Sequence, residues 1–341
     1  MLQPVADDAS IHLGAAGAVA VGAGEITYLE AITAALRDAM RDDERVFLIG
    51  EDIGHFGGPF GATKGLFEEF GEARVIDTPI AEEGFVGAAA GAAWMGERPV
   101  AELQFADFVS CAFDTLVTVA AKTHWRAGIR LPMVVRAPSG GGVGGGPFHS
   151  QSPEGWFVGE PGLKVVCPGT VADAYGLLRS AIDDDDPVLF FEHKGLYRSL
   201  KAAPPPAGHR VPLGRAAVAR PGGSATLVTY AAGVRLAVEA VEGLDVEVLD
   251  LRTVWPFDEA AIAESVRRTG RLCVLQEASA GKGAGDAVLA FAARALFADL
   301  DAPPVLVAPV VAPVPFSPPL EEAYLPSAAR VRAAVEDLLA W

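Results

Sequence analysis

Short apolar segments alternate with helix-like segments along almost the whole chain, and this alternation is the feature that most restricts its fold. Before residue 201 the predicted strands are 46–50, 74–80, 100–105, 133–137, 164–167 and 187–192. The predicted helices around them are 26–41, 66–70, 84–95, 107–127 and 171–182. Such an alternation favours a parallel sheet with helices on both faces. The sequence therefore predicts an α/β domain over residues 25–200.

A proline-rich stretch at residues 201–213 follows this region, and its three consecutive prolines favour an extended linker. The alternation then restarts. The predicted strands are 226–230, 246–251, 272–276 and 304–310, and the predicted helices are 234–241, 258–269, 285–297 and 327–339. We therefore expect two three-layer α/β domains with parallel sheets, the second over residues 214–341. Residues 1–24 lack the basic residues of a signal or transit peptide and are predicted to form a flexible extension.

The composition excludes several classes of function. The 341 residues carry a net charge of −17, which argues against nucleic acid or anionic membranes as partners and is compatible with a basic protein partner. No uninterrupted apolar run reaches the roughly 18 residues of a membrane span. The three cysteines, Cys111, Cys167 and Cys273, have no metal-binding or disulfide spacing. We expect them to be buried in a cytoplasmic protein.

Several polar side chains follow predicted strands, where ligands bind in open α/β sheets. They are Glu51, Glu82, Gln104 and His149. Glu82 lies at a strand-to-helix junction, near the positive end of a helix rich in Gly and Ala that allows close approach by a partner. It is a candidate acid/base. The alternative is an ordinary solvated first-turn carboxylate, which is the role expected for one of the adjacent pair Glu82 and Glu83.

Histidines and glycine runs offer further candidates. His149 follows a glycine run at 140–146 and is either a general acid/base or a surface side chain. His55 is a weaker candidate, while His124 and His193 are expected to be structural. The glycine run lacks the Gly-Lys-Ser/Thr ending of a phosphate-binding P-loop, and residues 281–285 lack the acidic partner of a dinucleotide site.

Long, collinear motifs carry a specific resemblance. They are GEDIG (50–54), FGGPFGATKGL (56–66), RVIDTPIAE (74–82), AELQFADF (101–108), PFHSQSPE (147–154), PGLKVVCP (161–168), DLRTVWPFD (250–258) and PFSPPLEEAYLP (315–326). With these motifs the chain resembles the β subunit of thiamine-diphosphate-dependent 2-oxo acid dehydrogenases, the E1 component, over nearly everything after residue 25. The resemblance implies a transketolase-like pyrimidine-binding domain followed by a transketolase C-terminal domain.

The resemblance also implies a division of labour between two chains. In this family an α subunit holds the diphosphate and its Mg²⁺ through a motif that includes asparagines. This chain contains no asparagine, so we expect no Mg²⁺ ligands in it. The implied assembly is an α2β2 heterotetramer that shares thiamine diphosphate between the two kinds of subunit and acts on a 2-oxo acid. A lipoyl-bearing E2 acyltransferase is the implied acyl acceptor.

Roles follow from the position of each residue in the motifs. Glu82 matches the carboxylate that hydrogen-bonds N1′ of the cofactor pyrimidine and promotes loss of the thiazolium C2 proton. His149 matches a histidine that contacts the substrate or the lipoyl group. The residues matching or neighbouring the pyrimidine site are Ile80, Gln104, Phe108 and Glu51. Phe108 departs from the tyrosine typical of the branched-chain enzymes, which removes a hydroxyl.

Two further implications concern ions and substrates. Some family members hold K⁺ in a region that corresponds to Leu131, Val134, Asp184 and Asp186, although Asp186 replaces the asparagine expected there. The motifs favour a branched-chain substrate of the 3-methyl-2-oxobutanoate type, with pyruvate or acetoin as alternatives. A different class of function, a non-catalytic scaffold that bridges the α chain and E2, is disfavoured by Glu82.

Overall fold

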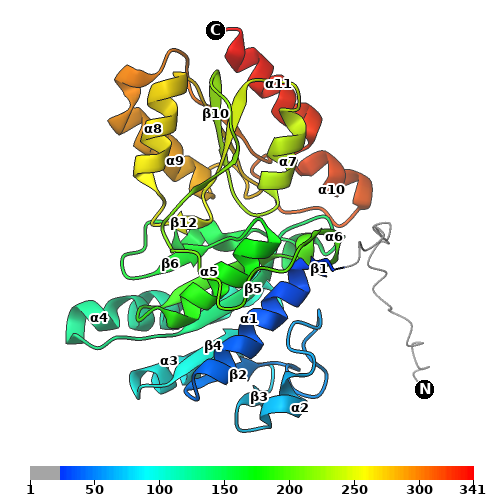
Figure 1. Ribbon diagram of the computed structural model, residues 1–341, viewed down its shortest axis with the longest axis vertical. Helices are drawn as coiled ribbons and strands as arrows, with labels where there is room; N and C mark the ends of the chain where they lie inside the picture. Colours follow the sequence, from blue (N-terminus) through cyan, green and yellow to red (C-terminus); the bar gives the residue numbers. More distant parts are fainter. Residues whose placement is uncertain (1–23) are drawn as a thin grey trace, which may run out of the picture.

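A computed structural model describes residues 24–341, which form two α/β units stacked along the long axis of the molecule (Figure 1). Apart from Gly24, the predicted N-terminal extension lies outside the described residues. The first unit contains a seven-stranded sheet with the strand order β12-β6-β7-β5-β4-β2-β3. Its strands are β2 (Val46–Gly50), β3 (Val75–Asp77), β4 (Arg98–Glu102), β5 (Val134–Ser139), β6 (Lys164–Val166), β7 (Val188–His193) and β12 (Thr253–Trp255).

All neighbouring pairs in this sheet are parallel except β12 and β6. The strands are apolar because both faces of the sheet are covered. Four of them, β5, β4, β2 and β3, are adjacent and parallel, so their carboxyl ends form one continuous edge. The segments that leave this edge carry the candidate site residues.

Helices cover both faces of the first sheet. One face packs against α1 (Tyr28–Asp42), α5 (Val171–Asp183) and α6 (Leu196–Ser199). The other face packs against α3 (Glu82–Trp94) and the helical segment that ends with α4 (Ala121–Ala127). The short helix α2 (Leu66–Phe70) lies between β2 and β3. Helix α1 starts at Thr27, whose side chain and that of Glu30 form a reciprocal capping box.

The predicted single helix over residues 107–127 is wrong. The structure has a 3₁₀ segment at Ala106–Ala112, a π-helical segment at Thr115–Ala120 and only then α4. One feature of the sequence and one tertiary contact account for the difference. The stretch Thr115–Ala120 is rich in β-branched residues, which lower α-helix propensity. The first turn of the 3₁₀ segment is also held by Gln151, whose backbone and side-chain N–H groups donate to Asp107.

The second unit contains a five-stranded sheet with the order β14-β13-β10-β11-β9. Its strands are β9 (Ala217–Arg220), β10 (Ala225–Thr229), β11 (Val246–Asp250), β13 (Leu272–Leu275) and β14 (Val305–Val307), and only β9 is antiparallel to its neighbour. The sheet lies between α7 (Gly233–Ala240) with α11 (Ala328–Leu339) and α8 (Glu259–Thr269) with α9 (Ala284–Ala295). Helix α10 (Pro318–Tyr324) lies beside the first unit (Figure 1).

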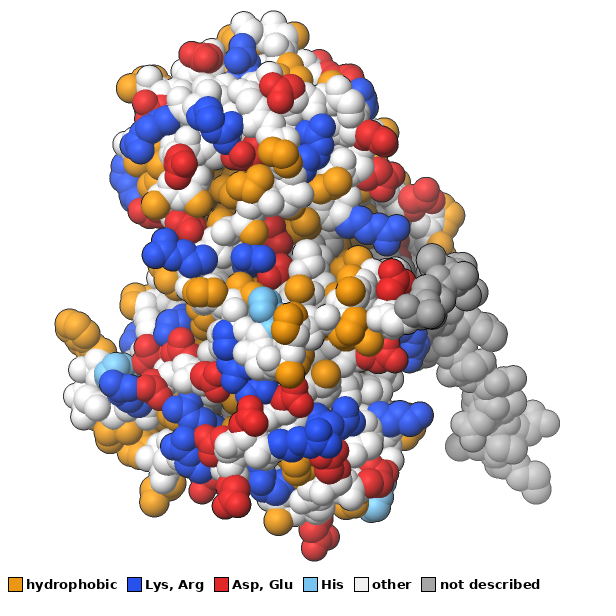
Figure 2. Space-filling model, in the orientation of Figure 1, with side chains coloured by type: hydrophobic (Ala, Val, Ile, Leu, Met, Phe, Trp, Pro, Cys, Tyr) orange, Lys and Arg blue, Asp and Glu red, His pale blue; other side chains and the backbone are white. Residues whose placement is uncertain are grey.

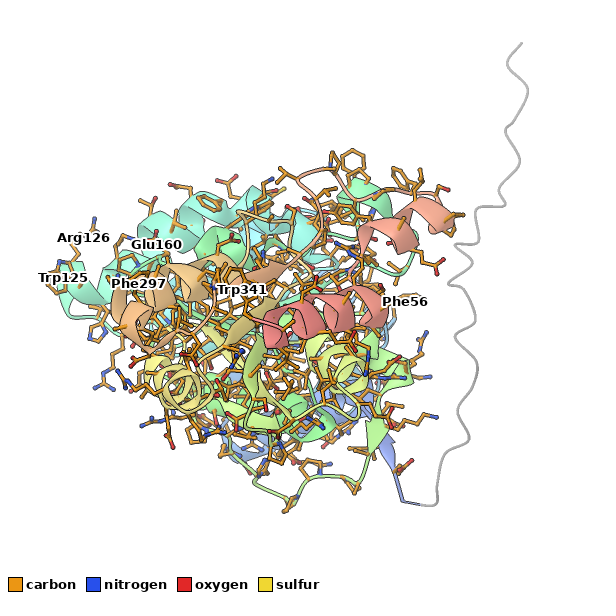
Figure 3. All side chains as sticks on the ribbon, turned by 90° about the horizontal axis from the view of Figure 1, so that it is seen from above. Phe56, Trp125, Arg126, Glu160, Phe297 and Trp341 are labelled. Atoms are coloured by element: carbon orange, nitrogen blue, oxygen red, sulfur yellow. The ribbon has the colours of Figure 1, made fainter. Side chains whose placement is uncertain are left out.

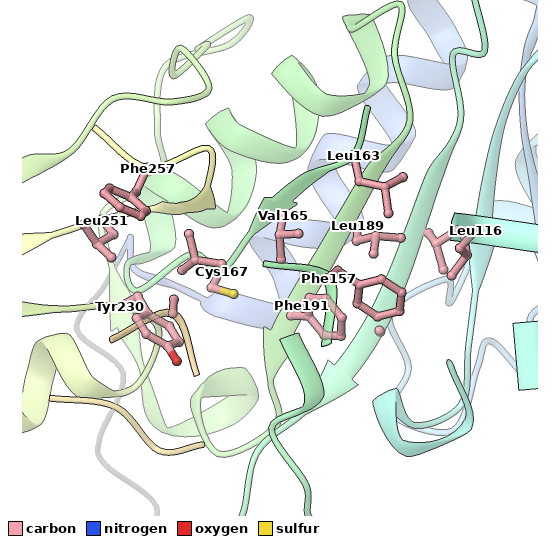
Figure 4. Packing of buried hydrophobic residues seen from close by; sticks show 14 of the residues in the cluster. Leu116, Phe157, Leu163, Val165, Cys167, Leu189, Phe191, Tyr230, Leu251 and Phe257 are labelled. Atoms are coloured by element: carbon pink, nitrogen blue, oxygen red, sulfur yellow. The ribbon is translucent and has the colours of Figure 1, made fainter. Parts of the chain in front are cut away.

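One hydrophobic core continues from the first unit into the second. Phe157 and Phe191 of the first unit and Tyr230 and Phe257 of the second belong to the same buried cluster (Figure 4). Strand β12, which comes from the second unit in sequence, completes the first sheet. Because burial of each such side chain contributes about 1.5–3 kcal/mol, this shared core holds the two units together.

The sequence predicts an extended linker for the proline-rich stretch, but the stretch is only partly extended and free. Its first residues form β8 (Lys201–Ala202), which pairs antiparallel with β1 (Ile26–Thr27). Further along, Val211 is buried, and its backbone N–H donates to Gly176 of α5. The stretch is therefore fastened to the first unit at both ends. The expectation of three buried cysteines is also wrong for Cys111, which is exposed.

The surface is charged but carries several large apolar side chains. Acidic and basic groups are interspersed over the face shown in Figure 2. Trp125, which is 94% exposed, projects from the outer end of α4 (Figure 3) beside an apolar cavity of about 840 Å³. Met95 and Ile80 are also more than three-quarters exposed. Among the helices of residues 24–341, none has the length and apolar character that crossing a membrane requires.

Candidate active site

Two carboxyl groups meet where β2 and β3 end. Glu82 opens α3, which begins at this residue and not at residue 84 as predicted, and no side chain caps the helix. Glu51 follows β2, is almost fully buried and accepts a hydrogen bond from the backbone of Ala81. Burial and the nearby Glu82 carboxylate raise the pKa of Glu51. Such a pair favours a ligand that offers a hydrogen-bond donor.

The pair has unused hydrogen-bonding capacity. Oε1 of Glu51 is buried without a partner, and within the described part of the chain Glu82 has no hydrogen-bond partner either. A buried polar atom without a partner costs about 1–3 kcal/mol, so a hydrogen-bond donor from outside the chain would stabilise this arrangement. Ile80, which is 80% exposed, lies close by in sequence and offers an apolar surface.

Gln104 joins these carboxylates to the next strand. It follows β4 and its side-chain amide donates a 3.1 Å hydrogen bond to Oδ2 of Asp52, the neighbour of Glu51. Because β2 and β4 are parallel and adjacent, the two loops leave the same edge of the sheet. The structure therefore brings Gln104 to the same rim as Glu51 and Glu82.

His149 lies among aromatic rings on the same rim. Its ring is 4.6 Å from the ring of Phe105 and 5.6 Å from that of Phe108, both in edge-to-face geometry. Such contacts fix the plane of the imidazole. Phe108 thus packs on His149, a contact that does not need the hydroxyl of the tyrosine expected at this position. All three rings remain partly accessible to solvent.

Two residues that sequence reasoning did not identify support this arrangement. Asp107, which is buried, accepts from the backbone and side chain of Gln151 and thereby holds the segment that follows His149. Lys194 is buried with its Nζ 5.7 Å from the centre of the Phe105 ring. Asp107 lies within a quoted motif and Lys194 outside all of them, and their contacts join residues far apart in sequence, which no local pattern reveals.

His193 and His55 have partners away from these carboxylates. Nε2 of His193 lies 2.8 Å from Oε2 of Glu277, a residue of the second unit. The ring of His55 packs on Phe67 at 4.1 Å. Neither histidine contacts Glu51 or Glu82 in the described structure. A structural role for His124 and His193 stays a prediction.

The predicted cation position is rich in ion pairs. The residues in question are Leu131, Val134, Asp184 and Asp186. Lys164 Nζ lies 2.6 Å from Asp184 Oδ1 and 3.3 Å from Asp186 Oδ2, and His124 Nδ1 lies 2.8 Å from Asp186 Oδ1. Burial opposes ionisation of Asp186, but His124 and Lys164 outweigh it and lower its pKa. Both carboxylates are already paired with Lys164, so backbone carbonyls would have to hold the ion. The K⁺ site stays a prediction.

The rim fits one half of an aromatic cofactor. A pyrimidine ring needs an acidic partner for a ring nitrogen and an apolar surface for its face. Glu82 would be the acidic partner, and exposed Ile80 with partly accessible Phe108 would supply apolar surface. The small residues of α3 leave room for close approach from outside. Among residues 24–341, no three His, Cys, Asp or Glu side chains gather to hold a metal ion.

Comparison with known proteins identifies both units. Residues 24–199 match the pyrimidine-binding domain of transketolase, and residues 214–331 match the transketolase C-terminal domain. Among solved structures, a split-gene transketolase described as an inactive beta4 tetramer matches with a TM-score of 0.74 over 92% of this chain and 98% of that one, at 24% identity. This likeness shows the fold.

Curated relatives are closer in sequence. The 2-oxoisovalerate dehydrogenase subunit beta of Bacillus subtilis is 44% identical over 92% of this chain and 98% of its own length. The pyruvate dehydrogenase E1 component subunit beta of the same organism is 43% identical, covering 89% and 95%. The beta subunit of acetoin:2,6-dichlorophenolindophenol oxidoreductase of Cupriavidus necator is 42% identical, covering 89% and 94%. The chain therefore belongs to the transketolase-like family of 2-oxo acid dehydrogenase E1 β subunits.

Proposed function

We propose that this chain is the β subunit of an E1 enzyme that decarboxylates a branched-chain 2-oxo acid of the 3-methyl-2-oxobutanoate type and passes the acyl group to lipoyl-E2. The observation that carries the proposal is the rim of the first sheet, where Glu82 lies beside buried Glu51 and both have unused acceptors. The relative at 44% identity supports the branched-chain assignment. Pyruvate and acetoin remain alternatives, because relatives with those names are 43% and 42% identical.

Thiamine diphosphate is the proposed cofactor, and when bound it supplies the nucleophilic carbon that attacks the 2-oxo group. Glu82 would hold N1′ of the pyrimidine through a hydrogen bond, and Ile80 with Phe108 would line the ring. Gln104 and Glu51 hold the surrounding loops, and Glu51 keeps a buried acceptor next to Glu82. The diphosphate and Mg²⁺ are proposed to lie on an α subunit, since this chain contains no asparagine for the family's metal motif.

An α2β2 heterotetramer is the proposed assembly. Exposed apolar side chains support it, because Ile80, Met95 and Trp125 are each at least 80% exposed. Large apolar groups on a surface commonly mark contacts with another protein. Copurification of an α subunit that carries the Mg²⁺ motif tests the assembly directly. Purification of this chain without any such subunit would contradict the heterotetramer.

A panel of 2-oxo acids tests the substrate assignment. The chain assembled with its α subunit is expected to have a higher kcat/KM for 3-methyl-2-oxobutanoate than for pyruvate. Decarboxylation is measured with an artificial electron acceptor, so that no E2 is needed. A clear preference for pyruvate would contradict the branched-chain assignment and leave the E1 assignment intact.

His149 is proposed to act in acyl transfer. Replacing it with alanine is expected to slow reductive acylation of a free lipoyl domain by about 10²-fold, the lower end for a general acid/base, and to slow decarboxylation less. Each half-reaction is measured on the assembled enzyme. His55→Ala is the matched control, because His55 is a loop histidine that packs on Phe67. Equal slowing of both half-reactions by His149→Ala would contradict a role in acyl transfer.

A further inference from the structure

The loop that carries His149 is held by the second unit. Its glycine run points backbone N–H groups at two carboxylates. Gly141 donates to Glu277 Oε1 at 2.7 Å, while Gly142 and Gly144 donate to the two oxygens of Glu321 at 2.9 Å each. The run thus forms an anion-binding concavity that is filled by carboxylates of the same chain.

We propose that Glu321 and Glu277 are positioning residues that fix the glycine loop and thereby set the place of His149 on the rim. This inference rests on the proposed function and adds to it a role for the C-terminal domain. Hydrogen bonds from N–H groups to a carboxylate are about twice as strong as those between neutral groups. Two such carboxylates therefore give an irregular loop a definite position.

The loop is closed at its base, so the position of its glycine run affects the position of His149 through the backbone. Gly140 donates to the carbonyl of Gln151 at 3.0 Å, which joins the two ends of the loop. Glu277 also accepts from Ser152 Oγ at 3.2 Å, just beyond this closure. With its base and its glycine run both fastened, the loop leaves His149 little freedom to move.

Close packing explains why the loop needs glycine. Gly140 has a φ of +90°, and a Cβ there would lie 2.2 Å from the His193 ring. Gly146 has a φ of +61°, and a Cβ there would lie 2.5 Å from the Phe316 ring. His193 ends β7 of the first unit and Phe316 belongs to the second unit, so the loop is shaped to fit between the two units.

Glu277 and Glu321, with the glycine N–H groups that they bind, form a clamp on the loop that has charged neighbours. Burial opposes ionisation of Glu277, but the His193 ring, the Gly141 N–H and the Ser152 hydroxyl outweigh it and lower its pKa to about 2. Burial lowers the pKa of Lys194 to about 8, against the attraction of the Asp107, Glu277 and Glu321 carboxylates. Lys194 thus supplies positive charge next to the clamp and contacts Phe105, which touches His149.

A single substitution tests the clamp. Glu321→Gln keeps the shape of the side chain but replaces one acceptor oxygen with an NH2 group, which cannot accept from a glycine N–H. The ratio of lipoyl acylation rate to decarboxylation rate in the assembled enzyme is expected to fall about 10-fold. Glu322→Gln is the control, because Glu322 is the exposed neighbour of buried Glu321 on the same helix. A general loss of folding would lower both rates together and leave the ratio unchanged.

Amide hydrogen exchange tests the clamp independently of the proposed function. Amides of residues 140–150 are expected to exchange faster in Glu321→Gln than in the unsubstituted chain or in Glu322→Gln, whether or not the enzyme accepts any 2-oxo acid. Unchanged exchange in this loop would overturn the clamp. Faster exchange with an unchanged rate ratio would overturn its role in placing His149. Absent decarboxylation in the unsubstituted enzyme would instead overturn the proposed function.

Discussion

The Glu82→Ala chain, assembled with its α subunit, is expected to decarboxylate a 2-oxo acid on the order of 10⁴-fold more slowly than the unsubstituted enzyme. Under the proposed function the Glu82 carboxylate activates the cofactor, and no other group would replace it. Glu51 lies beside it, but its side chain is almost fully buried and accepts from the backbone of Ala81, so it does not take the place of Glu82. The rate is measured with an artificial electron acceptor at saturating cofactor.

Glu83→Ala is the matched control. Glu83 is the next residue in the first turn of α3 and is exposed, so it has the same interaction with the helix dipole but does not lie beside Glu51. Its substitution is expected to change the decarboxylation rate less than twofold, roughly the scale of a surface change. Full activity of Glu82→Ala would remove the catalytic assignment and favour the scaffold alternative. Equal losses in both variants would indicate damage to α3.

The sequence was sufficient to predict the two α/β units because their parallel strands are continuous apolar runs. Val46–Gly50 is such a run, and the charged residue after it marked the end of the strand correctly. A strand that is buried on both faces consists of consecutive apolar residues, and such a run can be recognised in the sequence. The edge that gathers Glu51, Glu82 and Gln104 followed from this topology, since parallel strands place their carboxyl ends together.

Features that depend on contacts between distant residues were missed. Strand β12 has three residues and pairs antiparallel with β6 across the boundary between the units, so no local period reveals it. The clamp on the glycine run joins Gly142 to Glu321 across 179 positions. The sequence showed the glycine run and the absence of a P-loop lysine. Only the fold shows that the N–H groups of this run donate to carboxylates of the same chain, as those of a P-loop donate to a phosphate.

Deep in the first unit, Arg136 supports the strands that carry the site. Its Nε and Nη2 donate to the two oxygens of Glu192 at 2.6 and 2.7 Å, and its Nη1 donates to Glu102. All three side chains are almost inaccessible to solvent. They join β5, β7 and β4, and Glu102 ends the strand that leads to Gln104. The position of the rim therefore depends on this buried cluster.

Arg136→Met is expected to lower the free energy of unfolding by about 3–5 kcal/mol at pH 7, because two buried carboxylates then lose their counter-charge. The loss is measured by urea denaturation. Burial raises the pKa of Glu102 even in the intact cluster, despite Arg136. Without Arg136 the folded-state pKa rises further above the unfolded value, so the folded state holds its proton more tightly. The variant therefore loses stability as pH rises above the unfolded pKa and recovers part of it as pH falls.

Arg130→Met is the control for this pH-dependent loss. Arg130 pairs with Asp185, but its side chain is 65% exposed, so removing it is expected to cost less than about 1 kcal/mol. A loss in Arg136→Met no larger than in Arg130→Met would contradict the structural role of the buried cluster. A loss that stays constant from pH 5 to pH 8 would show instead that packing of the arginine stem, and not its charge, stabilises the three strands.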